Sequence, residues 1–114
     1  MTHECHAEGC ERAVPPRLLM CAQHWRLLPS PAQRIIWHHY RVGQELDKKP
    51  SALYLLAQRT AVLLVAFIEG TWSARRALQE LATASAAAQR RGLNLGDVEE
   101  MARAMGCERI VGAQ

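Results

Sequence analysis

Apolar residues recur at the spacing of a helix face over most of the chain beyond residue 29. The first such segment follows Pro29, where Ser30 is a suitable N-cap and Pro31 suits the first helical position. Gly43 can end this segment, because glycine readily adopts the left-handed conformation that commonly follows a helix. We therefore predict a helix over residues 31–42.

A second, more apolar helix is predicted over residues 52–69. Ser51 can cap its beginning and Gly70 can end it. The segment is apolar on nearly all its faces and contains the longest apolar run of the chain, from Ala61 to Ile68. Such a helix has to be covered by neighbouring helices or by a second copy of the chain. A homodimer formed through residues 52–69 is therefore one arrangement to consider.

Residues 71–114 predict a helical hairpin. A helix over residues 73–91 has a narrow face of small side chains that permits close packing. That face consists of Ala74, Ala77, Leu78, Leu81, Ala82 and Ser85. Gly92 can end this helix, and Asn94 with Asp97 resembles a capping pair for a shorter amphipathic helix that ends before Gly106. A short strand is considered only at residues 109–111.

The length of 114 residues allows one domain with a hydrophobic core and is too short for two independent ones. Apolar residues make up 49% and charged residues 22%, a composition that excludes a disordered chain. We predict one mainly α domain over residues 1–114. In it, a small zinc-stapled module at residues 1–28 packs on a bundle of about four helices, formed by the helical pair 29–70 and the C-terminal hairpin 71–114.

Three of the four cysteines and one histidine lie close together near the amino end. They follow the pattern Cys5-x4-Cys10-x10-Cys21-x2-His24. Two short-range pairs of such ligands, here separated by Pro15-Pro16, are typical of tetrahedral zinc and do not resemble a disulfide framework. Residues 1–17 contain few large apolar side chains, so metal binding would supply the free energy that orders them. We predict that these four residues bind Zn²⁺, with His3 and His6 as alternatives for one ligand.

The ligand types also predict the role of the metal ion. Three thiolates and one imidazole fill the four positions of a tetrahedral zinc ion. A catalytic zinc ion normally keeps one position for water and needs a nearby acid or base. We therefore predict a structural zinc ion and no enzymatic activity.

The string WHHY at residues 37–40 contains two aromatic residues three positions apart on the first predicted helix. Trp37 and Tyr40 are expected to pack against Trp25 and Leu28, and so to join the module to the helices. The two histidines between them point about 100° apart on a helix, so they do not readily share a metal ion.

Basic residues are spread along the chain, which has 14 lysines and arginines, 11 acidic residues and a formal charge of +3. Five arginines of the first half are candidates for contact with nucleic-acid phosphates. They are Arg12, Arg17, Arg26, Arg34 and Arg41. Glu4, Glu8 and Glu11 lie among them and weaken the local positive field. Nucleic-acid binding is therefore the weaker of the predicted functions.

The amino-terminal half resembles a known family. The Cys-x4-Cys pair, the sequence VPPRLLMCAQHWRLLPSPAQRIIWHHYRVGQE and the following KPSALYLLAQRTA are similar to small zinc-binding proteins encoded by tailed bacteriophages and prophages of Gram-negative bacteria. The resemblance covers about residues 5–61, and the chain departs from it after about Phe67. It implies a phage origin and a closed zinc site formed by the four ligands named above.

We therefore expect a non-catalytic zinc-binding protein that binds a host or phage protein complex, including an inhibitor of host defence such as an anti-CRISPR protein. The alternative is a zinc-containing nucleic-acid-binding module, either a regulator or a DNA-associated phage protein. The amino end lacks the features of a secretory signal, and the longest apolar run is far shorter than the roughly 20 residues that cross a bilayer. We expect the cytoplasm of a bacterial host and no membrane partner.

Overall fold

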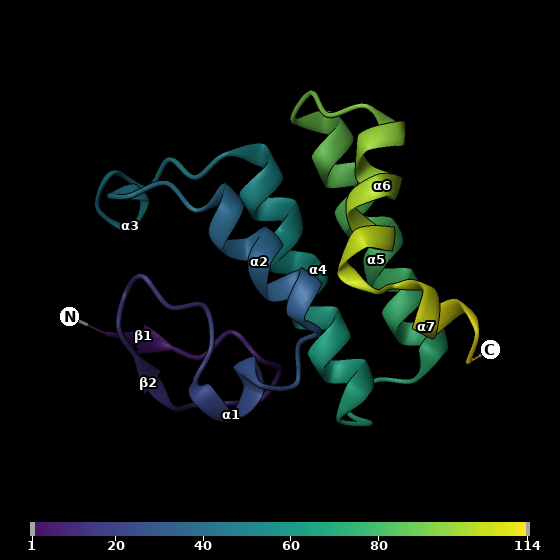
Figure 1. Ribbon diagram of the computed structural model, residues 1–114, viewed down its shortest axis with the longest axis horizontal. Helices are drawn as coiled ribbons and strands as arrows, with labels where there is room; N and C mark the ends of the chain where they lie inside the picture. Colours follow the sequence, from purple (N-terminus) through teal and green to yellow (C-terminus); the bar gives the residue numbers. More distant parts are fainter. Residues whose placement is uncertain (1, 114) are drawn as a thin grey trace.

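The computed structural model describes residues 2–113 and confirms a mainly α fold. Its elements are β1 (His3–Glu4), β2 (Ala13–Val14), α1 (Ala22–Trp25), α2 (Ser30–His39), α3 (Gln44–Asp47), α4 (Ala52–Ile68), α5 (Ala74–Arg90), α6 (Leu95–Met105) and α7 (Glu108–Val111). Figure 1 shows three parts side by side: the amino-terminal module with β1, β2 and α1, then α2 and α4, then α5, α6 and α7.

The amino-terminal module contains a small antiparallel sheet that the sequence did not predict. His3 of β1 lies opposite Val14 of β2, and Glu4 lies opposite Ala13. Each strand has only two residues, which is too short to produce the alternating pattern that identifies a strand. The sheet brings the first residues of the chain back beside the loop that precedes α1 (Figure 1).

The predicted bounds of the helix at residues 31–42 were wrong at both ends. Pro29 is the N-cap of α2, and Ser30 is already its first helical residue. The helix ends at His39 because Tyr40 is extended, with its hydroxyl donating a hydrogen bond to Glu45 Oε2 at 2.7 Å. Gly43, with φ of 90°, precedes the short helix α3 instead of ending α2.

Helix α4 begins as predicted, because Ser51 Oγ accepts a hydrogen bond from the backbone N–H of Tyr54 at 3.0 Å. Leu63, Leu64 and Val65 are fully buried, and α2, α5 and α6 pack around the helix. The apolar faces of α4 are thus covered within one chain, and a homodimer through this helix stays a prediction. No helix among residues 2–113 has both the length and the apolarity needed to cross a membrane.

The C-terminal part forms the predicted helical hairpin. Asn94 Oδ1 accepts from the backbone N–H of Asp97 at 2.8 Å, which confirms the predicted capping pair. Ser73 was predicted as the first helical residue but is the N-cap of α5, because its Oγ accepts from the backbone N–H of Arg76 at 3.1 Å. The strand considered at residues 109–111 was wrong, because this segment belongs to α7. Ile110 is fully buried there, and α7 packs against α5.

Candidate metal centre

Four side chains of the module converge on one point. They are Cys5, Cys10, Cys21 and His24. Their ligand atoms all lie within 4.8 Å of one another, close enough to hold a metal ion. His24 Nδ1 lies 3.3 Å from Cys21 Sγ and 3.6 Å from Cys5 Sγ. A tetrahedral zinc ion at ordinary bond lengths sets its ligand atoms about 3.5 to 3.8 Å apart. The cluster therefore has the dimensions of a tetrahedral metal site.

The backbone of the module positions these ligands. Gly9 has a left-handed φ of 77°, which turns the chain so that Cys10 N–H donates to the carbonyl of Ala7 at 3.1 Å. Cys21 precedes α1, and His24 lies one turn further along it, so both face the same side. The backbone N–H of Cys21 also donates to Cys5 Sγ at 3.2 Å, which joins the two halves of the cluster.

The thiols of Cys5 and Cys21 differ in pKa because their surroundings differ. Burial raises the pKa of the Cys5 thiol to about 11. Burial also disfavours the thiolate of Cys21, but hydrogen bonds from His24, Cys5 and Cys10 lower its pKa to about 6. Without an ion, the thiol of Cys5 therefore stays protonated at neutral pH, whereas that of Cys21 is favoured as the thiolate. A bound divalent cation would ionise all the thiols that coordinate it.

The structure adds Glu69 to the site, a residue that the sequence did not indicate. His24 Nε2 donates a hydrogen bond to Glu69 Oε2 at 3.0 Å, while Nδ1 faces the sulfur atoms. Metal-binding histidines commonly donate their second ring N–H to a carboxylate, which fixes the tautomer and the ring orientation. Glu69 lies at the C-cap of α4, 45 residues away in the chain, so no local spacing could reveal it. It joins the candidate metal centre to the longest buried helix.

Loss of this carboxylate should weaken metal binding. We expect Glu69→Ala to reduce zinc affinity by roughly 10- to 100-fold, the usual effect of removing the partner of a metal-bound histidine. Glu69→Gln should have a smaller effect, because the amide oxygen can still accept from Nε2. Competition with a coloured zinc chelator measures both affinities. Glu80→Ala is the control, because Glu80 pairs with Arg76 outside the cluster. Equal zinc affinities for Glu69→Ala and Glu80→Ala would contradict a role for Glu69.

The two alternative histidines lie outside the cluster. His6 Nδ1 is 3.2 Å from Gln58 Nε2, and the rings of His3 and His6 are 5.0 Å apart. Neither joins the group of side chains whose ligand atoms are within reach of one ion. The structure therefore brings together the four residues that the spacing indicated first.

The aromatic contact predicted between the module and α2 is present. The rings of Trp25 and Trp37 lie edge to face at 6.3 Å, and those of Trp37 and Tyr40 at 5.4 Å. The ring centroids of Tyr40 and Tyr54 are also 6.3 Å apart, so the aromatic contacts continue from α2 to α4.

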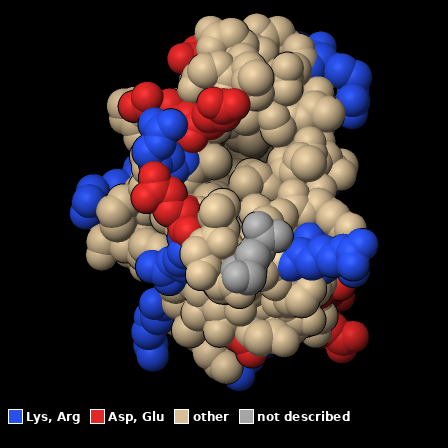
Figure 2. Space-filling view, turned by 90° about the vertical axis from the view of Figure 1, so that its right-hand side faces the viewer, with Lys and Arg blue, Asp and Glu red and all other residues tan. Residues whose placement is uncertain are grey.

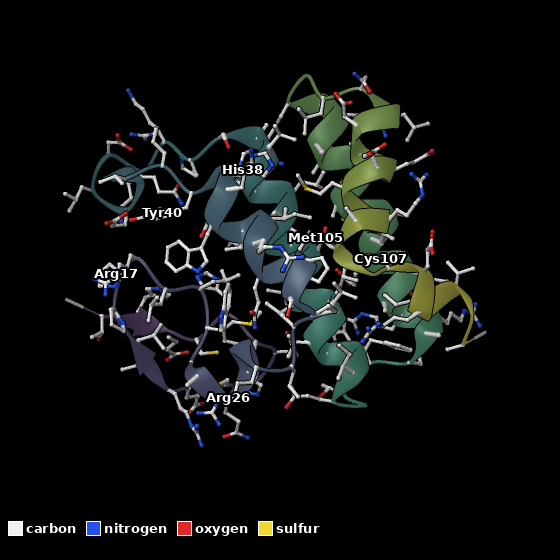
Figure 3. All side chains as sticks on the ribbon, viewed as in Figure 1. Arg17, Arg26, His38, Tyr40, Met105 and Cys107 are labelled. Atoms are coloured by element: carbon white, nitrogen blue, oxygen red, sulfur yellow. The ribbon has the colours of Figure 1, made fainter. Side chains whose placement is uncertain are left out.

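The five candidate arginines are exposed but do not converge. Arg17 and Arg26 lie at different edges of the module (Figure 3). Arg41 is already engaged, because its guanidinium donates to Asp47 Oδ1 at 2.7 Å and to the Lys49 carbonyl at 2.9 Å. Arg12 lies just before β2 and Arg34 lies within α2. The arginines are therefore spread over several elements.

The side of the molecule that carries α6 and α7 also lacks a basic field. Figure 2 shows basic and acidic side chains at the edges of this face, around an uncharged and partly hollowed centre. A nucleic-acid surface usually concentrates basic groups on one face. This view gives no such concentration over the C-terminal hairpin.

Comparison of the chain with protein-family models gives no match, and comparisons with curated proteins and with solved structures give none either. The resemblance to phage zinc-binding proteins therefore stays a prediction from the sequence. The function has to be inferred from the cluster and from the surfaces around it.

Proposed function

We propose that this protein is a non-catalytic interaction protein whose amino-terminal module is held together by a structural zinc ion. The observation that carries the proposal is the largely buried cluster of three cysteines and one histidine, with Cys10 half-buried and His24 oriented by Glu69. Four protein ligands complete a tetrahedral shell and leave no position for a substrate. A site of this kind stabilises a fold and supplies no reactive water.

Zinc is the metal that this donor set favours. A tetrahedral set of three thiolates and one imidazole suits zinc or an iron–sulfur centre. Iron–sulfur clusters contain several sulfide-bridged metal ions, whereas the ligand atoms here lie within 4.8 Å of one another, as around one ion. Structural zinc ions with similar ligands contribute directly to folding, which suits a module with few large buried side chains.

The surface beside the module supports a protein partner. Trp37 is 44% exposed, Val42 87% and Leu46 79%, and these residues lie within ten positions of the chain, from the end of α2 to α3. Exposed large apolar side chains so close together in the chain suit a protein interface, where tryptophan is also enriched. We propose that the partner is a host or phage protein complex in the bacterial cytoplasm. A role as an inhibitor of host defence, such as an anti-CRISPR protein, rests on the sequence resemblance alone.

Affinity capture tests the proposal. The zinc-loaded protein is used as bait in a bacterial lysate, with and without nuclease, and bound proteins are identified by mass spectrometry. We expect a defined protein complex that survives nuclease and is lost with the double variant Val42→Asp, Leu46→Asp. Leu95→Asp is the matched control, because Leu95 is also exposed, at 49%, but lies at the start of α6. Equal capture by the double variant and by Leu95→Asp would contradict a partner at this surface.

A nucleic-acid-binding module remains the second candidate. It is favoured by Arg12, Arg17, Arg26 and Arg34, which are exposed and form no ion pair within residues 2–113. Phosphate contacts by so few arginines would give weak binding with a shallow dependence on salt, because the slope scales with the number of phosphates neutralised. Recovery of nucleic acid in the capture experiment, with all proteins lost after nuclease, would favour this candidate over a protein partner.

A further inference from the structure

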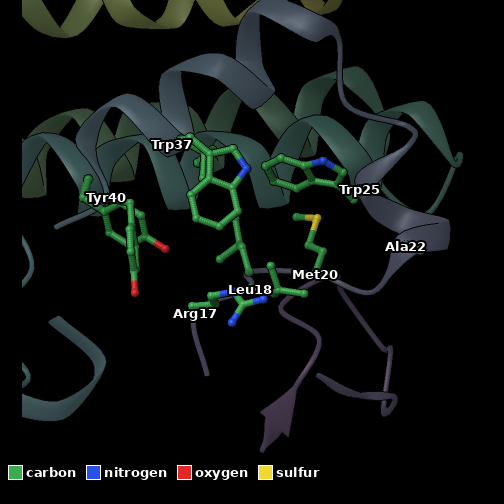
Figure 4. A pocket seen from close by; sticks show the side chains of 10 residues that line it. Arg17, Leu18, Met20, Ala22, Trp25, Trp37 and Tyr40 are labelled. Atoms are coloured by element: carbon green, nitrogen blue, oxygen red, sulfur yellow. The ribbon is translucent and has the colours of Figure 1, made fainter. Parts of the chain in front are cut away.

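A cavity of about 200 Å³ lies between the module and the helices. One wall is formed by the loop and α1 of the module, and the other by α2 and α4. The lining residues include Arg17, Leu18, Met20, Ala22, Trp25 and Trp37 (Figure 4). No helix or loop among the described residues fills this space.

The size and the walls of the cavity favour a flat apolar ring. A dry apolar cavity of about 150 Å³ is sufficient for benzene, so this cavity can accept a somewhat larger ring system. Trp25 and Trp37 meet edge to face at 6.3 Å on one side, and Met20 lies beside them (Figure 4). Aromatic faces and a methionine sulfur are good partners for an aromatic ring. The walls therefore suit one or two fused rings.

Arg17 gives the cavity a charge preference. It is the one charged residue among those that line the cavity, and it forms no ion pair within the described chain. Glu45 lies nearby, since both residues line an adjacent groove, and its pKa is lowered by the Tyr40 hydroxyl and, to a smaller degree, by the charge of Arg17. Its carboxylate is hydrogen-bonded to that hydroxyl at 2.7 Å and forms no ion pair with Arg17. The guanidinium of Arg17 thus keeps donors that match a carboxylate or a similar anion. The same charge opposes a cationic ligand in the cavity.

We propose that this cavity binds a small aromatic carboxylate, with its ring between the module and α2 and its anionic group at Arg17. The site is distinct from the metal cluster, and it shares Trp37 with the exposed surface that also includes Val42 and Leu46. It depends on the metal only because the module provides one of its walls. The proposal therefore holds whether or not the protein also binds a larger partner.

Three probes of equal size test the ligand class on the zinc-loaded protein. They are 2-naphthoate, 2-naphthylmethanol and 2-naphthylmethylammonium. Binding is followed by the NMR signals of the indole N–H groups, since Trp25 and Trp37 line the cavity and Trp72 does not. We expect 2-naphthoate to shift the Trp25 and Trp37 signals, leave that of Trp72 in place and bind about 5-fold more tightly than the alcohol. The ammonium compound should bind most weakly.

Variants separate the two parts of the site. Arg17→Met should remove the preference for the anion, and Arg34→Met, at an exposed arginine of α2, should keep it. Ala22→Phe fills the cavity and should abolish binding of all three probes. Gln23→Phe is the control, because Gln23 is the next residue of α1 and does not line the cavity. Zinc content and circular dichroism establish that each variant is folded.

Three results would overturn the proposal. The ammonium compound could bind as tightly as the carboxylate, so that Arg17 has no influence. Binding could survive Ala22→Phe, which would place the ligand elsewhere on the surface. A third contradictory result is that no probe shifts the indole signals. The cavity would then be a site for a side chain of a protein partner and not for a small ligand.

Discussion

Replacing Cys21 with serine is expected to release the metal ion and unfold about the first 30 residues, while the helices beyond Ser51 remain folded. Serine is a poor zinc ligand, and Cys21 also joins the two halves of the cluster through its backbone N–H. Structural zinc contributes about 10 to 16 kcal/mol in small zinc-binding peptides, as much as the whole stability of an ordinary domain. The few buried side chains of the module cannot replace this contribution.

Metal content and amide hydrogen exchange measure this prediction. The native protein should contain one zinc ion and protect the amides of β1, β2 and α1, whereas Cys21→Ser should contain none and lose that protection. Cys107→Ala is the control, because Cys107 is the other buried cysteine away from the cluster, with a pKa that burial raises to about 12. Unchanged amide protection in the module of Cys21→Ser would show that the metal does not hold it together.

Truncation of Leu64 to alanine should cause the largest loss of stability in the helical part. We expect the free energy of unfolding to fall by about 3 kcal/mol, because a fully buried leucine leaves both lost contacts and a cavity. Leu64 lies on α4, which α2, α5 and α6 enclose, so the surrounding helices can close the gap only in part. The zinc-loaded protein should keep its metal in this variant.

Urea unfolding followed by circular dichroism measures the loss. Leu95→Ala removes the same atoms from a leucine that is 49% exposed, and should cost less than about 1 kcal/mol. Similar losses for the two variants would mean that α4 is not the centre of the core. Repeating the titration at several protein concentrations also tests the homodimer, because the stability of a dimer rises with concentration.

Features set by neighbouring residues could be predicted from the sequence. Ser51 and Asn94 each cap a helix through a contact three residues away, and each is where the sequence placed it. The metal ligands fall in the same class, because Cys21 and His24 are one helical turn apart. Their spacing alone carries the chemistry of the site.

Most features set by distant contacts could not be predicted, although the packing of Trp37 against Trp25 was. The end of α2 depends on Tyr40, whose ring packs against Trp37 and Tyr54 and whose hydroxyl bonds to Glu45. The partner of His24 lies 45 residues away, and the aromatic cavity exists only because the module folds back on α2. The sequence gives the residues that make these contacts but not the distances between them in the folded chain.

The position of Glu69 has an electrostatic consequence for α4. The carboxyl end of a helix carries a partial negative charge, so an acidic side chain there is unfavourable unless a positive group offsets it. Glu69 stands at that end, and the donor that offsets its charge is the ring N–H of His24. A metal ion bound to the other ring nitrogen would strengthen this donor. It would thereby act on the last turn of α4 and on the bend at Gly70, where the chain leaves for α5.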